Sequence, residues 1–196
     1  MLIYYKNIFR TVILFLCFAN LSPVNCQEAF SSLSLGINIL KNKPDKDFNN
    51  YWNSDLGIEG RFETPFYFGD LQAGGILLPF KSKNINQPDF NSYFIFMGWG
   101  KKVNLPLKLF FFSTIKAGSF VMNFNLDSLG STQKIESELG LGFKAGLGTH
   151  LFSPVQAFAG VEALQVFTRH KISFILFSAG LTYSFATPVW LKDFLE

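Results

Sequence analysis

Hydrophobic and polar residues alternate along most of this chain with a period of two, the pattern of β-strands that have one apolar face. From residue 138 to 148, leucine, phenylalanine and alanine at odd positions alternate with glycine, glutamate and lysine at even ones. From Ser178 to Phe185, Ala179, Leu181 and Tyr183 share one face with Phe185, while Ser178 and the other even positions share the opposite face. Eight such segments, separated by turn-forming residues, fit between residues 29 and 185, so the pattern predicts an all-β fold.

The alternation of apolar and polar residues is clearer in some predicted strands than in others. They cover, approximately, residues 32–39, 55–62, 70–80, 92–100, 105–124, 138–148, 155–167 and 171–185. Segments 70–80 and 92–100 are almost continuously apolar, so their inward and outward positions stay open.

The predicted connections alternate between short and long. Short turns are expected at residues 64–69, 101–104 and 152–154. Polar loops are expected at Lys41 to Asn53, Lys81 to Asn91 and Asn125 to Gln133, with a tight connection at Arg169 and His170. Short turns at one end and longer loops at the other are typical of transmembrane barrels. The sequence therefore predicts an eight-stranded antiparallel up-and-down transmembrane β-barrel, with both termini at the short-turn end.

Composition agrees with a membrane location. Charged residues make up 16% of the 196 residues and aromatic residues 17%, including 25 Phe. No apolar run of about 18 residues follows residue 20, so a helical membrane protein is not expected. A secreted lipocalin-like barrel is the alternative, but a water-facing wall needs many charges, whereas the less apolar face here is rich in glycine.

The ends of the chain are expected to lie outside the barrel. Residues 1–26 are predicted to be a signal peptide, because Lys6 and Arg10 precede a short apolar stretch. An uncleaved anchor and a lipoprotein acylated at Cys26 remain alternatives. The barrel is expected at residues 27–185. Residues 186–196 form a C-terminal extension, for which a short amphipathic helix is one hypothesis and a frayed tail the other.

The last predicted strand carries a recognisable motif. Ser178, Gly180, Tyr183 and Phe185 are spaced as in the assembly signal of bacterial outer-membrane barrels, which the segment resembles. Over nearly its whole mature length, the chain resembles the small outer-membrane β-barrel family that includes OmpA-like transmembrane domains and OmpX-like proteins. This resemblance implies a bacterial outer-membrane location and folding by the barrel assembly machinery. It also implies contact with outer-membrane lipid and lipopolysaccharide, and an extracellular partner of unknown identity.

Several charged residues are predicted to face the barrel interior, where opposite charges should pair across the lumen. They are Glu59, Arg61, Lys108, Lys116, Glu136, Glu138, Lys144 and Glu162. A paired, closed interior and a narrow path for ions are both compatible with this set.

Few residues suggest catalysis or metal binding. His150 and His170 are expected at opposite ends of the barrel, which makes a shared metal site improbable. Cys17 and Cys26 fall in the predicted signal. No basic tract indicates nucleic acid, and no cofactor is expected.

The favoured function is therefore a non-enzymatic structural or surface-interaction barrel whose long loops face outward. The alternatives are a narrow channel for ions or small solutes, a lipid-modifying enzyme using His150 near Ser153, and the lipocalin-like binding barrel.

Overall fold

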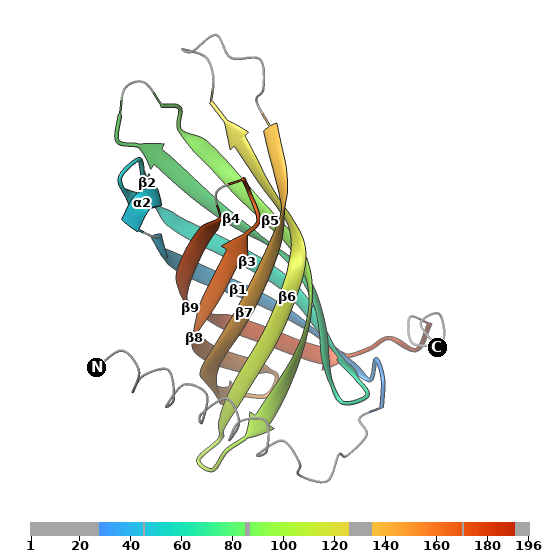
Figure 1. The fold of residues 1–196 in the computed structure, drawn as a ribbon. Helices are drawn as coiled ribbons and strands as arrows, with labels where there is room; N and C mark the ends of the chain where they lie inside the picture. The colour runs from blue at the N-terminus through green and yellow to red at the C-terminus, as the bar shows by residue number, and fades with distance from the viewer. Residues whose placement is uncertain (1–27, 45, 85–86, 126–134, 170, 191–196) are drawn as a thin grey trace, which may run out of the picture.

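A computed structural model of the protein describes residues 28–44, 46–84, 87–125, 135–169 and 171–190. Its strands form a closed antiparallel barrel (Figure 1). The barrel strands are β1 (Ser32–Pro44), β3 (Leu56–Phe66), β4 (Gly69–Ser82), β5 (Phe90–Asn104), β6 (Leu109–Phe124), β7 (Ile135–Phe152), β8 (Val155–Val166) and β9 (Ile172–Ala186). Each pairs with its neighbours in the chain, and β1 pairs with β9 to close the sheet. The predicted all-β, eight-stranded, up-and-down barrel is confirmed.

The first long connection contains more structure than the sequence suggested. β1 continues through Pro44, and the connection then forms the short helix α2 (Lys46–Asn49) and the strand β2 (Trp52–Ser54). β2 pairs with the end of β4, from Phe80 to Ser82. The expected loop from Lys41 to Asn53 was therefore too long, because the two-residue alternation persists to Lys43. In Figure 1, α2 and β2 lie at the upper end of the barrel.

The turn between β5 and β6 lies later in the chain than predicted. Residues 101–104 are not a turn, because they pair with residues 110–113 and extend β5. The chain reverses at residues 105–108, where Leu107 and Lys108 have φ angles of 63° and 60°. Pro106 suits this position, since its ring fixes φ and it has no backbone N–H to donate to a sheet. The lower end of the barrel in Figure 1 carries this turn.

The outer face of the barrel is apolar along most of its height. Ile37, Phe62 and Ile95 are 69%, 63% and 64% exposed, although each belongs to a long, well-paired strand. Their strand neighbours Asn38, Arg61 and Phe94 point inward and are buried. A barrel dissolved in water would place its polar residues outside, so this arrangement contradicts the lipocalin-like alternative and requires a hydrocarbon environment.

Among the described residues, no helix is both long enough and apolar enough to cross a membrane.

The interior is divided into layers. Toward the loop end, an apolar layer fills the lumen, including Phe80, Phe90, Phe94, Phe120 and Phe174. The rings of Phe80 and Phe90 stack with centroids 4.7 Å apart. A smaller group of Phe110, Phe112 and Phe158 lies toward the turn end. Lys116 lies against the Phe96 ring of the first layer and Lys144 near the Phe158 ring of the second, so these two charges lie between the layers.

Candidate functional site

Glu59 on β3 is the centre of the buried charge network. Lys116 on β6 places its Nζ 2.8 Å from Glu59 Oε1, and Lys144 on β7 places its Nζ 2.6 Å from Glu59 Oε2. Asn38 on β1 donates a hydrogen bond of 2.6 Å to the same Oε2. One carboxylate thus joins side chains from β1, β6 and β7 across the lumen.

Lys116 extends the network to the opposite wall. Its Nζ also lies 2.8 Å from Oε2 of Glu162 on β8. The ammonium group is 4.2 Å from the centroid of the Phe96 ring, a cation–π distance. Lys116, Glu59 and Glu162 are all fully buried. Burying such charges is costly unless they are paired, and here each cation contacts a carboxylate.

A glycine leaves room for the ion pair between Lys116 and Glu162. Gly142 on β7 is the register partner of Lys116 on β6. A Cβ at Gly142 would lie 2.8 Å from Glu162 Oε1 and 3.5 Å from Lys116 Cβ. The missing side chain therefore lets Lys116 and Glu162 meet over β7.

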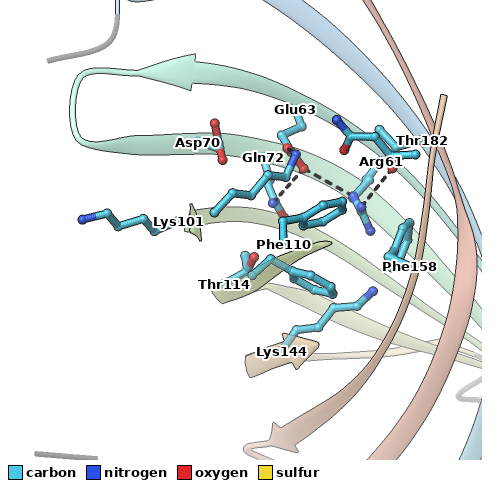
Figure 2. A pocket seen from close by; sticks show the side chains of 13 residues that line it. Arg61, Glu63, Asp70, Gln72, Lys101, Phe110, Thr114, Lys144, Phe158 and Thr182 are labelled. Carbon is cyan, nitrogen blue, oxygen red and sulfur yellow. Dashed lines mark hydrogen bonds and ion pairs between the residues drawn. The ribbon is translucent and has the colours of Figure 1, made fainter. Parts of the chain in front are cut away.

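A second polar group lies nearer the turn end. Arg61 donates a hydrogen bond of 3.2 Å from Nη2 to Thr182 Oγ1, and its Nε lies 3.6 Å from Glu63 Oε2. Gln72 donates to the same Glu63 oxygen at 3.0 Å, while Lys102 forms an ion pair with Glu63 Oε1. Figure 2 shows Arg61, Glu63 and Gln72 gathered on the wall opposite Lys144.

The space left among these groups is very small. The cavity shown in Figure 2 has a volume of about 10 Å³ and is lined by side chains such as Arg61, Phe112 and Lys144. A single water molecule needs roughly 10–15 Å³ in this measure. Together with the apolar layer above it, this packing leaves no wide aqueous path through the described part of the barrel.

Of the eight predicted interior charges, seven have inward parity in the structure and Lys108 does not. Glu59, Arg61, Lys116, Lys144 and Glu162 are buried and belong to the networks described above. Glu136 and Glu138 have inward parity but are half-buried, and they line the hollow at the loop end.

The interior assignment of Lys108 was wrong. Lys108 is exposed in the turn, because residues 105–108 leave the strand and its left-handed backbone breaks the two-residue alternation.

Glu63, Asp70, Gln72 and Lys102, which lie near the turn end, were not among the predicted interior residues. Glu63 continues the spacing of Glu59 and Arg61 on β3, so its parity alone could have identified it. Asp70 and Gln72 begin the strand whose facing was ambiguous. Lys102 was assigned to a turn that the structure moves elsewhere.

The residues of the resembled assembly signal lie on β9, next to the closing strand β1. Ser178 is buried and Gly180 packs against β1, where an added Cβ would lie 2.2 Å from the Ile37 carbonyl oxygen. Tyr183 and Phe185 are outward, 51% and 36% exposed. This arrangement leaves the two aromatic rings accessible from outside, while the small residues allow β1 and β9 to approach each other.

His150, the candidate catalytic histidine, lies at the turn end of the barrel. His150 packs near Phe110, with ring centroids 5.3 Å apart, and shares a shallow hollow with Ser153. Within the described residues no hydrogen bond joins the side chains of His150 and Ser153. The same part of the chain holds no group of three or more His, Cys, Asp or Glu arranged for a metal ion. His170 lies outside the described residues, as do the predicted signal peptide and most of the C-terminal extension.

Solved structures share this architecture. Neisserial surface protein A superposes with a TM-score of 0.57 at 15% identity, covering 81% of this chain and 100% of that one. The chain has the fold of the small outer-membrane β-barrels. The N-terminal β-barrel domain of Pseudomonas aeruginosa OprF matches with a TM-score of 0.53 at 13% identity, again covering 81% of this chain and 100% of the other. Ail, the attachment invasion locus protein of Yersinia pestis, gives 0.51 at 18% identity with the same coverage.

No family model matches the sequence, and no curated protein matches it. The likeness to the solved barrels therefore concerns the fold. The apolar outer face shows independently that this barrel lies in a membrane, and together the two observations place it in the bacterial outer membrane.

Proposed function

We propose that this outer-membrane barrel has a structural and surface-interaction role, with its loop end facing the exterior of the cell. The observation that carries this proposal is the filled interior. An aromatic layer and a paired charge network occupy the lumen, and the cavity among the charged side chains has a volume of about 10 Å³. A barrel filled in this way offers its ends, rather than its lumen, to other molecules.

The loop end offers the larger surface for such contacts. It opens into a hollow of about 780 Å³. Its walls include the aromatic side chains of Phe48, Trp52 and Phe90, and charged residues flank them at Glu138 and Arg169. Pockets of this size with mostly apolar walls and a few polar groups are typical of binding sites, including those in barrel mouths.

The similar barrels support a role at the surface. One is called a surface protein and another an attachment protein, and an Ail structure contains the heparin analogue sucrose octasulfate. An extracellular partner for the present barrel is accordingly part of the proposal, as is folding by the barrel assembly machinery. The proposed role is non-enzymatic.

The orientation can be tested by labelling intact cells with a membrane-impermeant maleimide. Asn84→Cys places a thiol on an exposed residue at the loop end, and Leu107→Cys places one at the turn end, where Leu107 is 88% exposed. We expect Asn84→Cys to be labelled on intact cells and Leu107→Cys only after the outer membrane is permeabilised. The unsubstituted protein controls for Cys17 and Cys26. The reverse labelling pattern would overturn the proposed orientation.

A further inference from the structure

The first residues of β7 pair with a neighbouring strand on one side only. Residues 135–139 pair with residues 119–123 of β6. On the other side, the register of β7 with β8 begins at Gly140, opposite Val166. Within the part of the chain that the structure describes, no strand pairs with this second side from Ile135 to Glu138, which we call the open edge. Figure 1 shows β6 and β7 rising beyond the end of β8 at the loop end.

The backbone geometry of β7 identifies the groups that the open edge offers. In an antiparallel sheet, the N–H and C=O of one residue point to the same side of its strand, and those of the next residue point to the other side. The Leu139 carbonyl oxygen accepts a hydrogen bond of 2.9 Å from the Phe167 N–H, on the β8 side. The N–H and C=O of Ser137 and Ile135 therefore point to that side, while those of Glu136 point toward β6. An extended polypeptide can pair with such alternating donors and acceptors.

The outer wall becomes partly polar where the open edge begins. Ser119 on β6 and Ser137 on β7 face outward and share a hydrogen bond of 2.8 Å between their hydroxyl oxygens. Farther along the same two strands, the outward residues include Ile115 and Leu141, which are exposed and apolar. This change is expected for strands that leave the hydrocarbon, where other polypeptides can reach the open edge.

The open edge forms one wall of the hollow of about 780 Å³ at the loop end. Trp52, Phe90 and Phe124 line the same hollow. Neighbouring strands lie about 4.8 Å apart, and successive side chains of a strand alternate between its two faces. Every second side chain of a strand added beside β7 would therefore enter the hollow, and the others would face outward.

The charged residues of the hollow are separated by sign. Among the described residues that line it, Glu136 and Glu138 lie on β7, whereas Arg169 and Lys171 lie on the connection between β8 and β9. The inward side chains of an added strand would lie nearest to those of β7, since side chains on paired strands are direct neighbours. Basic side chains at these positions would pair with the two glutamates. Arginine suits best, because its guanidinium group binds carboxylates and also stacks on aromatic rings.

We propose that the open edge binds an extended segment of an external protein by strand addition, with alternate basic side chains of that segment entering the hollow. Backbone hydrogen bonds to Ser137 and Ile135 hold the segment, and Glu136 and Glu138 select its charge. Arg169 and Lys171 favour an acidic residue at the end of the segment that lies beside them. This proposal rests on the surface-interaction role and names the kind of partner.

The test uses a labelled, end-capped peptide of about six residues in which arginine and valine alternate. Its binding to the full protein, refolded in non-ionic detergent, is measured by fluorescence anisotropy. Ser137→Pro should bind the peptide at least about tenfold more weakly, because proline has no N–H and its ring obstructs the open edge. Ser137→Ala is the matched control and should bind like the unsubstituted protein, since it loses the same hydroxyl but keeps the N–H.

Two further comparisons separate strand addition from simple attraction of charges. A peptide of the same sequence, N-methylated at every second residue on its pairing side, keeps the charge and should bind at least about tenfold more weakly to the unsubstituted protein. Glu136→Gln/Glu138→Gln should weaken binding of the arginine–valine peptide by about tenfold. A glutamate–valine peptide should not bind.

Equal binding by Ser137→Pro and Ser137→Ala would overturn strand addition, as would equal binding of the N-methylated peptide or no saturable binding of the arginine–valine peptide. Equal binding of the glutamate–valine peptide would overturn the charge selection. A dimer of the unsubstituted protein that Ser137→Pro abolishes would assign the open edge to a second copy of this chain instead.

The faster migration of unboiled samples on a gel shows whether Ser137→Pro is folded. If it does not fold, the N-methylated peptide decides the question with the unsubstituted protein. The result in detergent does not depend on which side of the membrane the loop end faces, and the maleimide labelling of Asn84→Cys reports that orientation separately.

Discussion

Lys116 and Glu59 lie 57 positions apart in the chain, yet their side chains meet at 2.8 Å with neither exposed to solvent. Lys116 comes from β6 and Glu59 from β3, so this contact spans the lumen between strands that do not pair. Removing one partner of a buried ion pair leaves the other charge without compensation, which usually costs about 3–5 kcal/mol. The contact therefore makes the stability of the barrel sensitive to single charges in its interior.

Glu59→Gln is predicted to lower the free energy of unfolding by about 3–5 kcal/mol, because Lys116 and Lys144 both lose a carboxylate partner. Urea unfolding of the refolded barrel in lipid vesicles measures this change. Glu138→Gln, which alters a half-buried residue at the loop end, is the control and should change stability by less than about 0.5 kcal/mol. Equal effects of the two substitutions would contradict a stabilising role for the network.

Gly142→Val is predicted to destabilise the barrel by about 1–3 kcal/mol, because the new side chain would occupy the space in which Lys116 and Glu162 meet. Gly60→Val is a suitable control, since a Cβ at Gly60 has no neighbouring atom within 4 Å. Urea unfolding under the same conditions compares the two variants. A tolerated Gly142→Val would show that the contact over β7 adjusts without cost.

Tyr183→Ala/Phe185→Ala is predicted to slow assembly in cells while changing the stability of the refolded barrel little. Both side chains point outward, so neither contributes to the packed interior. The fraction of folded protein in isolated outer membranes can be measured from the faster migration of unboiled samples on a gel. The control is Leu181→Ala, another outward substitution on β9 outside the resembled motif. Equal assembly of the two variants would contradict an assembly role for Tyr183 and Phe185.

The two-residue period was sufficient to predict the barrel and much of its charged interior. Glu59, Arg61, Lys116, Lys144 and Glu162 could be assigned inward because each lies in a strand with clear alternation. The period fails where both faces are apolar, as on β5, where Phe94 and Phe96 are buried and Ile95 and Met97 face lipid. Only the closed sheet decides which of these residues point inward.

The partners within the network could not be predicted from strand register. Lys144 and Glu162 are direct register partners on β7 and β8, but the short ion pairs join Lys144 to Glu59 and Lys116 to Glu162. These contacts depend on how long side chains cross the lumen around Phe96 and Phe158. The turn at residues 105–108 was missed for a related reason, since Lys101 to Asn104 resemble a polar turn although they pair with β6.

We propose that the barrel is closed to ions and acts through its loop end rather than through its lumen. Conductance of the full protein across a planar lipid bilayer tests this claim most directly, with a water-filled porin as the positive control. We predict no steady conductance steps at moderate voltage, because the aromatic layer and the ion pairs fill the lumen. Reproducible steps that scale with salt concentration would contradict a closed interior and would favour the channel alternative.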